Sequence, residues 1–205
     1  MGRERSRFDL ITSLVPEGCW PVVDVGADHG LVAERLGAIA TERAPGRRSM
    51  KPLPWVIGDG LKPFRTLEVA IITGMGARTI GRLLQEGARP TVAIIVHAPD
   101  DPILLRRTLA DQGWKIDAEG LAREAGRFAE VIRAVPGEEP SSGFELDFGP
   151  YLLASDDPFL EEHLHQLRGY WSGLAAKTRS CAPAKAEQFD RYASFLLRTL
   201  NARFG

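Results

Sequence analysis

Residues 22–30 read Val-Val-Asp-Val-Gly-Ala-Asp-His-Gly, and this stretch decides the fold. The valines have no helical periodicity, so they predict a short buried strand, whereas residues 31–36 have helical spacing. Gly26 and Gly30 lie between them. A glycine lets a ligand approach the backbone, and the first N–H groups of a helix point toward it. The pattern therefore predicts a nucleotide cradle, although such a turn can also simply join a strand to a helix.

Length and composition describe an ordinary globular protein. The 205 residues allow one domain and an appendage, and the net charge of −1 argues against nucleic-acid binding by bulk charge, though not against a local basic face. Cys19 and Cys181 are far apart and form no metal or redox motif, which fits a reducing cytoplasm. No signal peptide or membrane-spanning run is present, so we expect a cytoplasmic protein without membrane contact.

Apolar runs alternate with helical patterns along the first two thirds of the chain. After residues 22–25, strands are predicted at 55–57, 69–73 and 91–96, and helices at 3–15, about 30–43, about 78–85 and 102–112. Two further strands, 114–123 and 128–135, are joined by a polar turn. Strands that are apolar on both faces predict an α/β fold, with a mostly parallel sheet covered on both sides and an antiparallel hairpin at one edge.

The character of the chain changes after the last predicted strand. Residues 136–143 read Pro-Gly-Glu-Glu-Pro-Ser-Ser-Gly, which is typical of a linker. Residues 158–178 and 184–203 are predicted helices separated by a break at 180–183, and a short connection favours an antiparallel helical hairpin. We therefore expect two domains, residues 1–143 and 144–205.

Four glycine- or proline-containing loops follow predicted strands, and ligands of open α/β sheets bind at that edge. Three acids, Asp24, Asp28 and Asp59, belong to the same edge, where they could serve a ligand or cap helices and turns. His29 and His97 also follow strands closely, and each could act in the chemistry or be a hydrogen-bonded structural residue.

Metal-ligand spacings, a G-x-S-x-G elbow and a Walker lysine are all absent from the sequence. The loop that carries Arg47, Arg48 and Lys51 is the best candidate for contact with an RNA backbone, the alternative being a surface loop. Arg106 could meet a phosphate or belong to a solvated helix face.

Five motifs occur in a distinctive order: Arg7-Phe-Asp-Leu-Ile-Thr-Ser-Leu-Val-Pro16, Asp24-Val-Gly-Ala-Asp-His-Gly30, Gly58-Asp-Gly-Leu61, Ile72-Thr-Gly-Met-Gly76 and Phe148-Gly-Pro150. This order resembles the TrmK family, bacterial methyltransferases that modify N1 of an adenine in the D-arm region of tRNA. The resemblance implies a Rossmann-like class I methyltransferase domain and a helical C-terminal domain. It also implies S-adenosylmethionine as the cofactor and tRNA as the partner.

The resemblance assigns roles by motif. Asp24, Gly26 and Asp28 would lie beside the methionine end of the cofactor and Asp59 at the adenine end. Residues 74–76 would form the floor between the methyl donor and the target base. The full cofactor-binding prediction is Asp24, Gly26, Ala27, Asp28, Gly30, Asp59, Gly60, Gly74, Met75 and Gly76. The candidates for a direct catalytic role are Asp24, Asp28, His29, Met75 and His97, and the candidates for RNA contact are Arg47, Arg48, Lys51 and Arg106.

One segment departs from the family pattern. The family has a full strand and helix before its G-D-G-L motif, and that strand ends in an acid expected to hold the ribose hydroxyls. Residues 31–57 are predicted to form only one helix, a Pro/Arg-rich loop and one short strand. The ribose acid then has no counterpart, unless Asp59 takes its role. Two alternatives follow: a degenerate relative that binds RNA or protein without catalysis, and a methyltransferase acting on another substrate.

Overall fold

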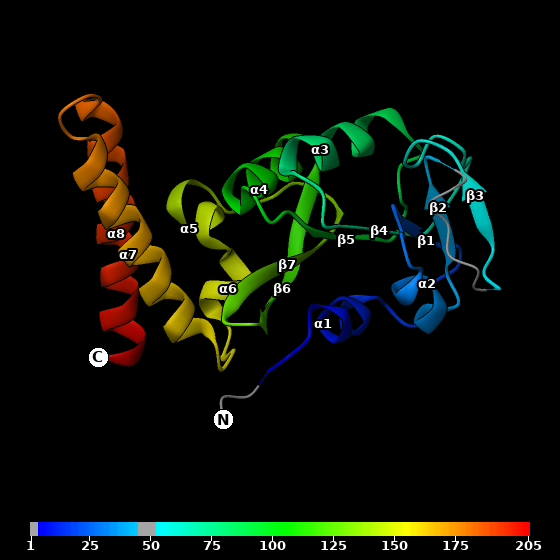
Figure 1. The fold of residues 1–205 in the computed structure, drawn as a ribbon, viewed down its shortest axis with the longest axis horizontal. Coiled ribbons are helices and arrows are strands. Elements are labelled where there is room, and N and C mark those ends of the chain that lie inside the picture. The colour runs from blue at the N-terminus through cyan, green and yellow to red at the C-terminus, as the bar shows by residue number, and fades with distance from the viewer. Residues whose placement is uncertain (1–3, 45–51) are drawn as a thin grey trace. The chain divides into compact units, whose positions relative to one another are not determined.

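The computed structural model describes residues 4–44 and 52–205, and the chain forms two compact units, residues 1–154 and 155–205. The first unit is built on a seven-stranded sheet of order β3-β2-β1-β4-β5-β7-β6 (Figure 1). The strands are β1 (Val22–Val25), β2 (Ile39–Glu42), β3 (Trp55–Ile57), β4 (Val69–Thr73), β5 (Ala93–His97), β6 (Trp114–Glu124) and β7 (Arg127–Pro136). The first five are parallel, and β7 runs antiparallel to β5 and β6. The predicted parallel sheet with an antiparallel terminal hairpin is confirmed.

Helices cover both faces of this sheet. In Figure 1, α3 (Ala77–Glu86) and α4 (Pro102–Asp111) lie on one side, and α1 (Arg7–Leu14) and α2 (Leu31–Leu36) on the other. Successive side chains of a strand point to opposite faces. Accordingly, Ile72 and Ile94 pack with the residues of α3 and α4, while Ile71 and Ile95 pack with those of α1 and α2. Burial on both faces explains why the central strands read as unbroken apolar runs.

The segment after the first glycine turn differs from the prediction. The helix expected over residues 30–43 ends at Leu36, because Gly37 adopts φ +63° and closes it. Residues 39–42 then form β2, which pairs with β1 in the register Val23↔Ile39. A strand therefore lies between the glycine turn and the G-D-G-L motif, where the sequence predicts none, and it ends in Glu42. The parallel neighbour of β2 is β3, in the register Glu42↔Ile57.

Two short helices that the sequence patterns do not predict complete the first unit. They are α5 (Gly143–Phe148) and α6 (Pro150–Ala154), and they pack against α4 and β6 respectively. The first unit therefore runs to residue 154, whereas the sequence places the boundary after residue 143. The apolar residues of these helices, including Phe148 and Leu152, are buried.

The second unit is the predicted helical hairpin. It consists of α7 (Leu160–Thr178) and α8 (Pro183–Phe204), which pack against each other. Trp171 of α7 contacts the rings of Phe189 and Tyr192 of α8, at centroid distances of 5.3 and 4.8 Å. No helix in the described part of the chain is long and apolar enough to cross a membrane.

Candidate active site

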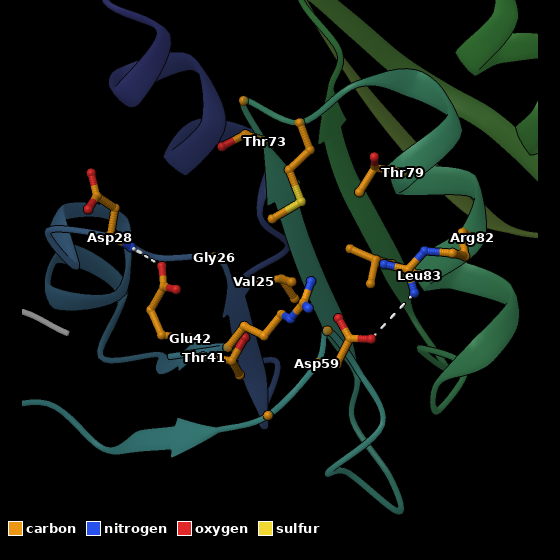
Figure 2. A pocket seen from close by; sticks show the side chains of 15 residues that line it. Val25, Gly26, Asp28, Thr41, Glu42, Asp59, Thr73, Thr79, Arg82 and Leu83 are labelled. Atoms are coloured by element: carbon orange, nitrogen blue, oxygen red, sulfur yellow. Dashed lines mark hydrogen bonds and ion pairs between the residues drawn. The ribbon is translucent and has the colours of Figure 1, made fainter. Parts of the chain in front are cut away.

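A cavity of about 490 Å³ lies at the C-terminal ends of the parallel strands (Figure 2). Its walls come from the turn after β1, the end of β2, the Gly58–Gly60 turn, the end of β4 and helix α3. Open α/β sheets bind ligands at this edge. The cavity brings together six of the predicted cofactor-binding residues, which are Gly26, Asp28, Asp59, Gly60, Gly74 and Met75.

The glycine turn after β1 leaves its backbone open toward the cavity. Gly26 has φ +69°, and a Cβ there would lie 2.4 Å from Cε of Met75. The N–H groups of Gly26 and Ala27 both donate to the carbonyl oxygen of Thr41, at 3.0 and 3.1 Å, which fastens the turn to β2. A side chain at residue 26 would have to displace the end of the Met75 side chain and adopt a left-handed backbone conformation, and glycine avoids both.

Glu42 is the site residue that sequence reasoning missed. It is the last residue of β2, it lines the cavity, and its Oε1 accepts a hydrogen bond of 2.9 Å from the N–H of Asp28. Figure 2 shows the two residues side by side at one end of the cavity. The missed signal was Gly37, which ends a helix, followed by the β-branched pair Ile39 and Thr41. The expectation that the strand-end acid has no counterpart is therefore wrong.

Asp24 lies behind the cavity instead of in its lining. Its side chain faces α2, is 5% exposed and accepts a hydrogen bond of 3.2 Å from the N–H of Ala33. The pKa of Asp24 is raised to about 7, mainly by burial. The hydrogen bond from Ala33 lowers this pKa, and the nearby carboxylate of Glu42 raises it. Asp24 thus serves as a carboxyl cap of α2, which is the structural alternative that its sequence allows.

Three other residues of the glycine turn, Ala27, His29 and Gly30, do not line the cavity. His29 is exposed, and its Nε2 lies 3.4 Å from Oδ2 of Asp28. Asp28 has φ +46°, and Gly30, which precedes α2 as its N-cap, has φ +66°. Of Asp28, His29, Gly30 and Ala27, only Asp28 lines the cavity.

His97 does not reach the cavity lining either. It is 4% exposed, and its Nδ1 hydrogen-bonds with the carbonyl oxygen of Glu130 at 2.9 Å. Burial lowers the pKa of His97, which favours the neutral imidazole. His97 therefore ties β5 to β7, and its predicted catalytic role has no geometric support. Gly76 is also outside the lining, where it precedes α3 and lies beside the carboxylate of Asp100.

The RNA-contact prediction for Arg106 is corrected by its burial. Its side chain is 1% exposed, with Nε 2.7 Å from Oε1 of Glu119 and Nη2 2.6 Å from Oε2 of Glu130. A guanidinium enclosed between two carboxylates is not available to RNA. Arg47, Arg48 and Lys51 lie outside the described residues. Among the described residues, no group of three or more histidine, cysteine, aspartate or glutamate side chains could hold a metal ion.

The TrmK family model, described as tRNA (adenine(22)-N(1))-methyltransferase, matches residues 47–194. The match covers well over half of the chain and begins after the glycine turn and β2. Curated protein sequences contain no match.

Solved structures resemble the chain over nearly its whole length. A candidate tRNA (m1A22) methyltransferase of Streptococcus pneumoniae is 23% identical with a TM-score of 0.81, covering 96% of this chain and 99% of that one. The structure of the same protein in complex with S-adenosyl-L-methionine aligns at 25% identity and a TM-score of 0.75, covering 97% and 100%. The Bacillus subtilis m1A22 tRNA methyltransferase TrmK is 18% identical with a TM-score of 0.76, covering 97% and 99%.

Proposed function

We infer that this chain, which belongs to the TrmK family of tRNA (adenine(22)-N(1))-methyltransferases, transfers a methyl group from S-adenosylmethionine to N1 of an adenine in tRNA. The observation that supports this most is the cavity at the strand ends. There the family's glycine turn, its G-D-G-L motif and its G-M-G motif meet around one space large enough for a nucleoside cofactor.

The carboxylates that line the cavity fit this cofactor. Glu42 uses Oε1 to hold the N–H of Asp28, which leaves Oε2 to accept hydrogen bonds from ribose hydroxyls. Asp28 and the open backbone at Gly26 suit the cationic amino-acid end, because a carboxylate attracts an ammonium or sulfonium group. Asp59 stands at the opposite end, where the amino group of adenine would lie. Glu42 thus takes the ribose role that the sequence could assign only to Asp59.

The S-adenosylmethionine would supply an electrophilic methyl group on a sulfonium sulfur. Adenine N1 is already a nucleophile, so the chain mainly aligns it and excludes water. Met75, in the loop after β4, lies against the Gly26 turn, and both Gly74 and Met75 line the cavity. These two residues would form the wall between the cofactor and the target base. The carboxylate of Asp28 can balance the positive charge that N1 methylation leaves on the base.

The target adenine must present its N1 edge, which base pairing hides. An enzyme that acts there needs an unpaired base or one turned out of its stack. tRNA is therefore proposed as a folded substrate whose adenine is presented to the edge of the sheet near Met75.

The test combines binding and turnover on the purified full chain. Titration calorimetry with S-adenosylhomocysteine should show one site per chain, with weaker binding for Glu42→Gln and unchanged binding for Glu17→Gln, which alters an exposed acid outside the cavity. Incubation with S-adenosylmethionine and tRNA should yield 1-methyladenosine in digested nucleosides. Cofactor binding without methylation of any tRNA would contradict the proposed reaction and support a role in binding alone.

A further inference from the structure

Four charged side chains form a cluster at the Asp59 end of the cavity, and we refer to Asp59, Lys62, Arg82 and Glu86 as the rim cluster. Lys62 Nζ lies 3.3 Å from Asp59 Oδ2 and 2.9 Å from Glu86 Oε2. Arg82 Nη1 lies 3.4 Å from Asp59 Oδ2 and 2.6 Å from Glu86 Oε2. Each cation therefore bridges the same two carboxylates, and Asp59 and Arg82 also line the cavity.

The two cations engage only one oxygen of Asp59. Both contacts go to Oδ2, which leaves Oδ1 for another donor. Figure 2 shows one carboxylate oxygen of Asp59 facing Arg82 and the other directed into the cavity. Hydrogen bonds from Arg82 and then Lys62 lower the pKa of Asp59, so its carboxylate is an acceptor throughout the neutral range.

Arg82 is held in place by the packing of its own helix. The next residue, Leu83, packs so closely on the Asp59–Gly60 turn that a Cβ on Gly60 would lie 2.5 Å from Leu83 Cδ2. The pair of Arg82 and Glu86 has i,i+4 spacing on α3, which brings the two side chains to the same face. The guanidinium therefore reaches Asp59 from a firmly docked helix.

We propose that Arg82 is a positioning residue that fixes the carboxylate of Asp59 so that Oδ1 accepts a hydrogen bond from the exocyclic amine of the cofactor's adenine. This proposal rests on the proposed function and deepens it, since it assigns the orientation of the base-reading carboxylate to Arg82, a residue outside the five sequence motifs. A purine with a carbonyl group at the same position would face Oδ1 with a second acceptor. The purine carbonyl oxygen and Oδ1 of Asp59 would then face each other without a hydrogen between them, and both would lack a hydrogen bond. The site therefore selects the purine that carries an amino group.

The experiment compares two ligands that differ only at that position, S-adenosylhomocysteine and its deaminated analogue S-inosylhomocysteine. Calorimetric titrations would use the wild-type chain, Arg82→Gln, Arg82→Lys and the control Arg78→Gln. Arg78 is an exposed arginine of the same helix that does not line the cavity. Thermal unfolding of each variant checks that the fold is retained.

We expect the wild type to prefer the adenosyl ligand. Arg82→Gln should weaken adenosyl binding by about three- to fivefold, the range of a partly exposed ion pair, and leave inosyl binding unchanged. Arg82→Lys should restore part of the preference, and Arg78→Gln should match the wild type. In turnover, Arg82→Gln should raise the KM for S-adenosylmethionine by the same factor at constant kcat.

Two results for Arg82→Gln would overturn the inference. One is an Arg82→Gln variant with wild-type preference, and the other is an equal loss for both ligands, which would indicate a general structural role. A wild type that binds S-adenosylhomocysteine without preferring it to the inosyl ligand would also refute the selectivity. A wild type that binds neither ligand would refute the proposed function itself, and that outcome is distinct from the other three.

Discussion

Replacing the buried Asp24 by asparagine should remove a pH dependence from the stability of the fold. Asp24 is 5% exposed, and the groups that face it are the N–H of Ala33 on α2 and the carboxylate of Glu42 on β2. The pKa of its carboxyl rises from 3.8 to about 7 on folding. The folded chain therefore binds this proton more tightly than the unfolded chain, and stability falls as the pH rises toward the raised pKa.

The magnitude follows from the pKa. Between pH 5 and pH 8 the wild type should lose about 3 kcal/mol of unfolding free energy from this group alone. The loss occurs over the two pH units from pH 5 to the raised pKa, and each pH unit lowers the unfolding free energy by about 1.4 kcal/mol. An asparagine keeps an acceptor oxygen for the N–H of Ala33 and cannot ionise. The Asp24→Asn variant should therefore lack this loss and be more stable than the wild type at pH 8.

The assay is urea unfolding of the wild type, Asp24→Asn and the control Asp111→Asn, followed by circular dichroism from pH 5 to pH 8. Asp111 is an exposed aspartate at the end of α4. Parallel stability curves for the wild type and Asp24→Asn would contradict this prediction, because they would show that the proton affinity of Asp24 does not change on folding.

Three further predictions concern residues whose neighbours are fixed by the structure. Glu42→Gln should weaken S-adenosylhomocysteine binding about tenfold in calorimetry, the value of one charge-assisted hydrogen bond; unchanged affinity would remove Glu42 from the site. Gly26→Ala should weaken binding of the same ligand about tenfold, because the new Cβ would displace the end of the Met75 side chain, which lines the cavity; wild-type affinity would show that this turn is not the cradle. Gly149→Ala should lower the unfolding free energy by about 3 kcal/mol in urea, since its φ is +94° and the Cβ would lie 2.8 Å from Nη2 of the buried Arg106; a loss below about 1 kcal/mol would contradict this.

The sheet was predictable because its central strands are unusually clear in the sequence. Residues 69–72 and 93–96 are apolar and buried on both faces, and glycines follow or flank the strands where the chain must turn. The order of motifs then placed the glycine turn, the G-D-G-L motif and the G-M-G motif at one edge, and the cavity contains residues of all three.

The site residues were harder to assign, because side-chain direction depends on the tertiary structure. Asp24 and Asp28 are four residues apart, yet the first faces α2 and only the second lines the cavity. Glu42 was hidden because the stretch before it, Leu36 to Thr41, contains only a single glycine to separate a short helix from a short strand. The burial of Arg106 was unpredictable for the same reason. A charged residue on an amphipathic helix is predicted to be exposed unless its buried carboxylate partners are known.

The most direct test of the central claim is the position of methylation on tRNA. A tRNA transcript with adenine at position 22 would be incubated with the protein and S-adenosylmethionine, and primer extension would then locate the modified base, since a methyl group at N1 blocks base pairing. We expect primer extension to stop at that single adenine, and to run through when the adenine is replaced by guanine. Full extension through the site, with cofactor and tRNA both bound, would contradict it.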